Sequence, residues 1–221
     1  MLHHEQVPRT RGRHLNHVAR LYDPLIEKMS LGRERRFREK TLAVMDITPH
    51  DHILDIGCGT GSLTILISQH LSENGSVVGI DAAPRMIKIA REKSAKAESR
   101  ATFATGVAEK LDFNNGSFDI VVNSMFTHHI DCELKQLAFA EMFRVLKPGG
   151  RLFTVDIDKP STVLAAIIGW TTRYILFQPE LEGNLKGRLP DFIREAGFQG
   201  TSIREHLYGM VSFYAARKPL L

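Results

Sequence analysis

The stretch from residue 53 to residue 61, I-L-D-I-G-C-G-T-G, constrains the fold more than any other part of the chain. Its apolar residues form the short run that is typical of a buried strand. Three glycines then recur at every second position, and because they lack a Cβ they predict a tight turn that another molecule approaches closely. Residues 62–71 follow with leucine and isoleucine at helical spacing. A strand, a glycine turn and a helix in this order predict a doubly wound α/β sheet with a nucleotide-like ligand at the turn.

A second acidic residue, Asp81, ends the next apolar run, residues 77–80. It lies 26 residues after Asp55, the acid of the first run. The carboxyl ends of parallel strands meet at one edge of a sheet, and an acid at the end of the second strand is placed to accept hydrogen bonds from ribose hydroxyls. We therefore predict that Asp81 binds the ribose of the ligand.

The spacing of the glycines distinguishes between two kinds of nucleotide. A dinucleotide-binding turn reads G-x-G-x-x-G, whereas this chain reads Asp55-x-Gly57-x-Gly59-x-Gly61. A carboxylate beside the turn disfavours a pyrophosphate and suits a ligand that carries an ammonium and a sulfonium group. A nicotinamide-dependent oxidoreductase, which would share the fold, is the alternative.

In this motif, and in the run E-M-F-R-V-L-K-P-G-G-R-L-F-T-V-D at residues 141–156, the chain resembles the class I S-adenosylmethionine-dependent methyltransferases. The resemblance implies a doubly wound, mostly parallel, seven-stranded Rossmann-like sheet with an antiparallel last strand. It implies S-adenosyl-L-methionine as the cofactor, with the glycine turn around its methionine part. The cofactor-binding residues that it implies are Asp55, Gly57, Cys58, Gly59, Gly61, Asp81, Ala82, Met86, Val107, Ala108 and Asn123.

Residues 18–32, V-A-R-L-Y-D-P-L-I-E-K-M-S-L-G, look like the entry segment of the ubiquinone and menaquinone biosynthesis (UbiE-like) methyltransferases. In that family a tyrosine-aspartate pair sits close to the cofactor, and Tyr22-Asp23 occupies this place. A tyrosine that only packs beneath its helix is the alternative.

The chain departs from the family pattern at two positions. Val107 replaces an acid that contacts the adenine amino group, so the adenine is expected to be held by backbone groups and apolar contacts. Ala83 replaces the serine before Pro84, so the helix that Pro84 begins is expected to lack its N-terminal cap.

Two adjacent histidines, His128 and His129, follow the predicted fourth strand at residues 118–122. Ligands of open α/β sheets bind at the carboxyl ends of central strands, and imidazole is a base near neutral pH. The two histidines and Tyr22 are therefore the candidate catalytic residues, and histidines without a chemical role are the alternative. We predict no metal site, because His128, His129 and Cys132 lack a separated second pair of ligands.

The length of 221 residues suits one domain with a short extension. We expect an N-terminal helical cover over residues 1–45, a methyltransferase domain over 46–221, and an apolar substrate-side insert at 161–186. The two cysteines exclude a disulfide framework, and the first residues lack the apolar core of a signal peptide. These features favour a cytoplasmic location.

Charge and apolar side chains suggest the partners. Residues 1–40 hold ten Lys or Arg against five Asp or Glu, a net charge of +5, and we call them the basic arm. Together with the apolar insert, the basic arm predicts reversible, peripheral contact with an anionic membrane; a solvated helix face is the alternative. Nucleic acid is not expected as a partner.

The expected reaction is methyl transfer to a small, apolar or lipid-like acceptor. The alternatives are the nicotinamide-dependent oxidoreductase and a non-catalytic module that only binds S-adenosylmethionine. The sequence does not identify the acceptor atom or the oligomeric state.

Overall fold

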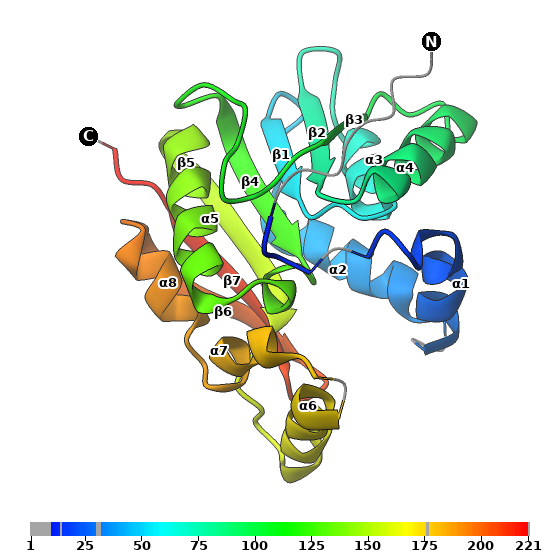
Figure 1. Cartoon of the computed structure of the whole chain (residues 1–221). Helices are drawn as coiled ribbons and strands as arrows, with labels where there is room; N and C mark the ends of the chain where they lie inside the picture. Colours follow the sequence, from blue (N-terminus) through cyan, green and yellow to red (C-terminus); the bar gives the residue numbers. More distant parts are fainter. Residues whose placement is uncertain (1–9, 14, 30–31, 176, 221) are drawn as a thin grey trace. The chain divides into compact units, whose positions relative to one another are not determined.

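The computed structural model describes residues 10–13, 15–29, 32–175 and 177–220 (Figure 1). The first nine residues of the basic arm, and Ser30 and Leu31 of the segment with the tyrosine-aspartate pair, lie outside the described residues. The chain divides into two compact units. The first comprises residues 1–10 and 14–107, and the second comprises residues 11–13 and 108–221. The predicted boundary after residue 45 and the predicted insert at 161–186 stay predictions.

The first unit contains three parallel strands in the order β3-β2-β1. They are β1 (His52–Ile56), β2 (Ser76–Asp81) and β3 (Thr102–Thr105). Two helices, α3 (Ser62–Ser68) and α4 (Pro84–Lys96), follow the first two strands. The apolar residues of β1 and β2 are buried, except for the half-buried Val78, as expected of parallel strands that are covered on both faces.

Two further helices, α1 (Ala19–Met29) and α2 (Glu34–Met45), precede β1 in the same unit. Helix α1 packs against α4, where Ala19, Ala83 and Met86 form a buried cluster. Tyr22 packs against this cluster. Helix α1 is therefore fixed to the element that follows Asp81.

The N-terminus of α4 has a cap that the sequence does not predict. Ala83 makes no capping hydrogen bond, as expected. Instead the Oδ1 atom of Asn16 accepts a hydrogen bond of 3.0 Å from the backbone N–H of Arg85. The expectation that Ala83 supplies no cap is confirmed, and a residue outside the helix satisfies one of its first N–H groups instead.

The second unit contains four strands in the order β4-β5-β7-β6. They are β4 (Phe118–Ser124), β5 (Leu146–Ile157), β6 (Gln199–Leu207) and β7 (Val211–Arg217). Strands β4 and β5 are parallel, whereas β7 runs antiparallel to both β5 and β6. The predicted fold class is confirmed: the sheet is seven-stranded and mostly parallel, and its last strand is reversed.

Two of the helices of the second unit are α5 (Cys132–Val145) and α8 (Leu189–Glu195). Asp131 caps α5 as its position before the helix suggests, accepting a hydrogen bond of 2.8 Å from the N–H of Leu134. A short 3-10 helix, η1 (Thr127–His129), holds the two histidines between β4 and α5.

Between β5 and α8 the chain forms α6 (Val163–Ile175), the 3-10 helix η2 (Pro179–Leu181) and α7 (Glu182–Leu185). Lys135 of α5 is fully buried, and its ammonium group donates hydrogen bonds to the carbonyl oxygens of Ile130 and Glu180. This side chain ties the end of the histidine segment to η2. Among the described residues, no helix has the length and the hydropathy to cross a membrane.

Candidate functional site

The glycine turn of the first unit adopts a backbone that favours glycine at all three positions. Gly57, Gly59 and Gly61 have φ angles of 72°, 54° and 77°. A Cβ at Gly61 would lie 2.6 Å from the ring of Phe103, so this glycine lets α3 pack closely. A Cβ at Gly59 would meet no protein atom within 4 Å, so the space beside this glycine is open to a ligand.

Asp81 joins the end of β2 to the glycine turn. Its Oδ2 atom accepts a hydrogen bond of 3.0 Å from the N–H of Gly59, and its Oδ1 atom accepts one of 2.8 Å from the N–H of Ala83. The carboxylate therefore fixes the turn and the start of α4 together. Ala82, the next residue in the chain, is half-buried, and Met86 in the first turn of α4 is buried.

Asp55 is buried beneath the same turn. Its Oδ2 atom accepts a hydrogen bond of 2.7 Å from the hydroxyl of Thr64 in α3, so the carboxylate orients the helix that follows the turn. Burial and, to a smaller extent, the nearby Asp81 raise the pKa of the Asp55 carboxyl to about 7, although the Thr64 hydrogen bond partly offsets them.

The two side chains of the tyrosine-aspartate pair in α1 lie in different environments. Tyr22 lies against the Ala19–Ala83–Met86 cluster, and burial raises the pKa of its hydroxyl. Asp23 accepts hydrogen bonds of 2.6 Å from the hydroxyl of Thr60, inside the glycine turn, and 2.8 Å from the ammonium group of Lys93. The aspartate thus ties α1 directly to the turn.

His128 of the second unit forms a buried pair with Asp156 at the end of β5. Its Nδ1 atom lies 2.6 Å from Oδ1 of Asp156. The carboxylate also accepts hydrogen bonds from the backbone N–H groups of Phe126, Thr127 and Ile157 and from the Thr127 hydroxyl. Burial alone would raise the pKa of the Asp156 carboxyl, but His128 and these donors outweigh it and hold the pKa below its usual range. Asp156 is therefore ionised, and its carboxylate can accept a hydrogen bond from Nδ1–H of His128.

His129 lies beside His128, with 4.0 Å between the ring centroids. Burial, and next the neighbouring His128, lower the pKa of the His129 imidazole, so this ring is neutral at physiological pH. Its Nδ1 atom is buried and makes no hydrogen bond with any described residue. A bound molecule with a polar group could satisfy it.

Residues 53–150 match a family of methyltransferase domains. An uncharacterised methyltransferase from Synechocystis is 33% identical over 186 residues, which is 81% of this chain and 81% of that protein. The chain belongs to the S-adenosylmethionine-dependent methyltransferases. Its cofactor is therefore S-adenosylmethionine.

Two further comparisons place this methyltransferase among its relatives. A demethylmenaquinone methyltransferase from Lactiplantibacillus plantarum is 33% identical over 149 residues, 66% of this chain and 62% of that protein. The solved structure of phosphoethanolamine N-methyltransferase 2 from Haemonchus contortus with S-adenosyl-L-methionine is similar in fold, with a TM-score of 0.65 at 18% identity. That match covers 82% of this chain and 52% of the other.

The residues of the first unit fit this cofactor. The open side of Gly59 offers the close approach that a ligand needs, and the carboxylate of Asp81 is held beside it by two backbone groups. Cys58 contributes its backbone N–H to the β2 carbonyl of Ile80, and burial raises the pKa of its thiol, so the thiol is not a nucleophile.

The other predicted cofactor residues are placed as follows. Val107 is half-buried at the end of the first unit, and Ala108 is buried at the start of the second. Asn123 in β4 is fully buried, and its amide donates to the hydroxyl of Thr154 at 3.0 Å. Its predicted contribution is a backbone carbonyl, and the structure leaves that role a prediction. Among the described residues, no cluster suited to a metal ion occurs.

Sequence reasoning missed two residues of the methyltransferase that act on the predicted ones. Asp156 holds His128, and Asn184 donates a hydrogen bond of 3.1 Å to the Thr127 hydroxyl. The position of Asp156 in the sequence could have indicated its role. It follows the apolar run of β5, and because β5 is parallel to β4, the two strands end at the same edge of the sheet.

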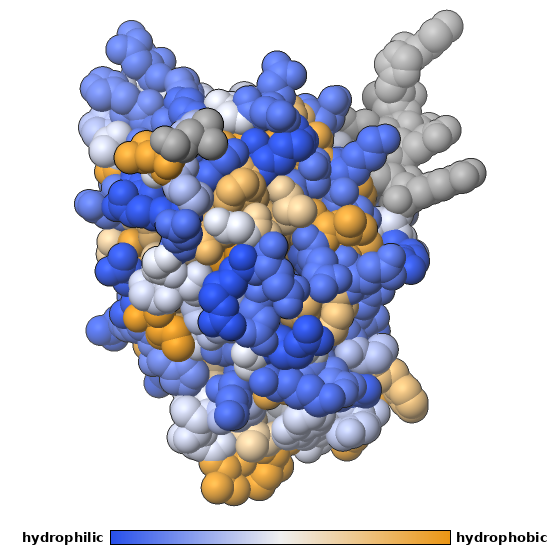
Figure 2. All heavy atoms as spheres, turned by 90° about the vertical axis from the view of Figure 1, so that its left-hand side faces the viewer, coloured by the Kyte–Doolittle hydropathy of each residue, from blue (hydrophilic) through white to orange (hydrophobic). Residues whose placement is uncertain are grey.

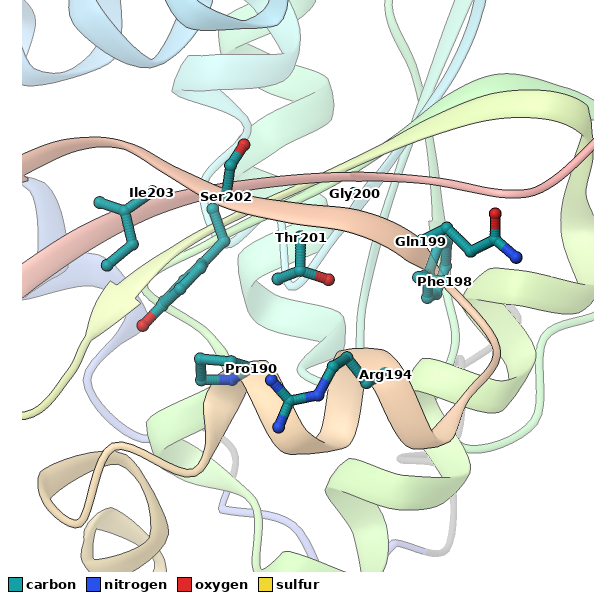
Figure 3. Close-up of a pocket in the computed structure, with 9 residues that line it drawn as sticks. Pro190, Arg194, Phe198, Gln199, Gly200, Thr201, Ser202 and Ile203 are labelled. Carbon is teal, nitrogen blue, oxygen red and sulfur yellow. The ribbon is translucent and has the colours of Figure 1, made fainter.

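A separate groove of about 610 Å³ lies between α8 and β6 (Figure 3). Pro190 and Arg194 of α8 face Thr201 of β6 across it. None of the predicted cofactor or catalytic residues lines this groove, and we assign it no role in methyl transfer.

Asp55 makes the stability of the methyltransferase depend on pH. Its pKa is 3.8 in an unstructured chain and about 7 in the folded protein, so the folded state binds more protons between these values. Its contribution to the free energy of unfolding is therefore present at low pH and is lost as the pH rises toward 7, by up to about 1.4 kcal/mol per pH unit.

We expect Asp55→Asn to remove this dependence, because asparagine can still accept the Thr64 hydrogen bond. Urea unfolding of both proteins across this pH range measures the difference. The variant should gain stability relative to the original protein as the pH rises. A difference that stays constant with pH would mean that folding does not raise the pKa of Asp55.

Proposed function

We propose that this methyltransferase acts on a phenolic, quinol-like acceptor and that His128 is its general base. The observation that carries the proposal is the 2.6 Å pair between Nδ1 of His128 and the buried carboxylate of Asp156. Several relatives, at modest identity, are named demethylmenaquinone methyltransferases, which supports a reduced aromatic ring as the acceptor.

The pair determines which nitrogen of His128 is basic. When the Nδ1–H donates to Asp156, the lone pair of the neutral ring lies on Nε2. This nitrogen can take the proton of a phenolic hydroxyl, and the ionised Asp156 then stabilises the imidazolium that forms. Removal of the proton places negative charge on the acceptor oxygen and, by conjugation, on the ring carbons beside it, which become nucleophilic.

The cofactor would be held by the first unit. The glycine turn would surround its methionine part, and Asp81 would accept hydrogen bonds from the ribose hydroxyls. When bound, S-adenosylmethionine supplies an electrophilic methyl group. The neutral, half-buried ring of His129 is suited to contact the acceptor through its unsatisfied Nδ1 atom.

A lipid-like acceptor also bears on location. We place the enzyme in the cytoplasm and at a membrane surface, where an acceptor with a long apolar tail would reside. Cys58 and Cys132 form no disulfide, in keeping with a reducing compartment.

The test is methyl transfer from S-adenosylmethionine that carries a radiolabelled methyl group. The acceptors are a naphthohydroquinone kept reduced, the corresponding naphthoquinone, and phosphoethanolamine. We expect label in the naphthohydroquinone alone, because only this acceptor offers a phenolic proton to His128. Label in phosphoethanolamine alone, or equal label in the quinone, would overturn the proposal.

A further inference from the structure

Helix α6 turns its large apolar side chains toward solvent. Leu164, Ile167, Ile168, Tyr174 and Ile175 lie on one stripe and are 68%, 59%, 51%, 63% and 67% exposed. We call these five residues the α6 stripe. A surface helix of a globular protein ordinarily does the reverse and buries its apolar face.

The opposite face of α6 carries small residues. Ala165 and Gly169 are buried, and a Cβ at Gly169 would lie 2.7 Å from the side chain of Leu185. The helix therefore approaches its neighbours closely through small side chains, and its bulky residues are left outside. Figure 2 shows apolar side chains gathered at the lower end of the molecule, where Figure 1 draws α6.

Helix α6 carries no acidic residue that an anionic surface would repel, and its one charged residue is Arg173. The Arg173 guanidinium donates to Glu182 at 2.7 Å and lies 4.9 Å from the ring centroid of Tyr174. Trp170 stacks on Tyr174 with 6.0 Å between the ring centroids. Aromatic rings beside a cation are typical of segments at the boundary between headgroups and acyl chains.

A second copy of the chain is a poor occupant for this stripe. A helix of 13 residues is about 20 Å long and about 10 Å wide, so one face covers roughly 200 Å². A stable protein–protein interface uses about 800 Å² on each partner. A lipid surface needs no such matching area, because acyl chains adapt to each side chain that enters them.

We propose that the α6 stripe docks this methyltransferase on a lipid bilayer, with α6 lying in the plane of the interface. The proposal deepens the proposed function and rests on it in one respect, since a lipid-like acceptor is delivered from the same surface. The docking surface that we propose consists of α6 alone, and attachment through one short interfacial helix is reversible.

The test is co-sedimentation of the full chain with vesicles of phosphatidylcholine, with and without phosphatidylglycerol. The variant Ile167→Asn, Ile168→Asn removes the centre of the stripe. Its matched control is Leu137→Asn, Ile203→Asn, because these residues of α5 and β6 are 47% and 54% exposed outside α6. We expect the α6 variant to lower the vesicle partition coefficient by about tenfold or more, and the control to leave it unchanged.

Equal binding of the original protein and the α6 variant would overturn the proposal. So would a dimer in sedimentation velocity without vesicles that the α6 variant converts to monomers. Methyl transfer to the water-soluble naphthohydroquinone, measured without vesicles, separates the two proposals. A protein that transfers methyl but does not bind vesicles refutes only the docking surface, and one that binds vesicles without transferring methyl refutes only the acceptor.

Discussion

Replacing His128 with alanine is expected to lower kcat for methyl transfer by about 10²- to 10⁴-fold, the usual contribution of a general base. The affinity for S-adenosylmethionine should stay unchanged, because the cofactor residues of the first unit do not depend on this ring. Steady-state kinetics with the naphthohydroquinone measure the first quantity, and calorimetry measures the second. Added imidazole should restore part of the rate, since it can occupy the space of the missing ring beside Asp156.

The adjacent histidine is the control. His129→Phe keeps an aromatic ring beside His128 but removes the Nδ1 atom that lacks a hydrogen-bond partner. We expect this variant to raise KM for the acceptor more than it lowers kcat. Asp156→Asn should lower kcat as His128→Ala does, because an asparagine amide would hold the imidazole in the wrong tautomer. If His129→Phe alone abolished turnover and imidazole failed to rescue His128→Ala, the base would not be His128.

Replacing Asp81 with alanine is expected to weaken S-adenosylmethionine binding by about 10- to 150-fold for each ribose hydrogen bond lost. This follows from about 1.5–3 kcal/mol for a hydrogen bond to a charged group. The structure gives a second cause of weaker cofactor binding, because Asp81 also accepts hydrogen bonds from the N–H groups of Gly59 and Ala83 and so fixes the glycine turn. Calorimetric titration with S-adenosylmethionine and with its demethylated product measures the loss.

Asp81→Asn separates the two causes. The amide oxygen of asparagine can keep one backbone hydrogen bond, so the fold of the turn is better preserved than in the alanine variant, while the negative charge is lost. We expect intermediate affinity and a melting temperature closer to that of the original protein. Undiminished affinity in both variants would mean that the ribose binds elsewhere.

Local patterns in the sequence predicted the elements that carry the site. The glycine turn, the acid that ends β2 and the histidines after β4 each depend on neighbours a few residues away. Such features follow from dihedral preferences and hydrophobic periodicity, which a single chain displays directly.

The contacts that organise the site were beyond such reasoning. Asn16 caps a helix 69 residues away, and Asp156 reaches a histidine 28 residues before it. Both contacts depend on which elements pack together, which periodicity does not encode. Helix α6 shows the same limit: the sequence predicted an apolar insert, but the small residues Ala165 and Gly169 decided which face of the helix turned inward.

The contacts of Lys135 and Asn184 have a consequence for protein engineering. Lys135 binds the carbonyl of Glu180 in η2, and Asn184 in α7 donates to Thr127 and to the carbonyl of Ile157. The segment between β5 and α8 therefore supplies part of the scaffold that orients the base. If this segment were grafted into a homologue to alter acceptor preference, its Glu180 carbonyl and Asn184 amide would lack the partners that Lys135, Thr127 and Ile157 supply here. Helix α6 is itself tied to α7 by the Arg173–Glu182 ion pair and by the close approach of Gly169 to Leu185, so only its outward apolar residues are candidates for exchange on their own.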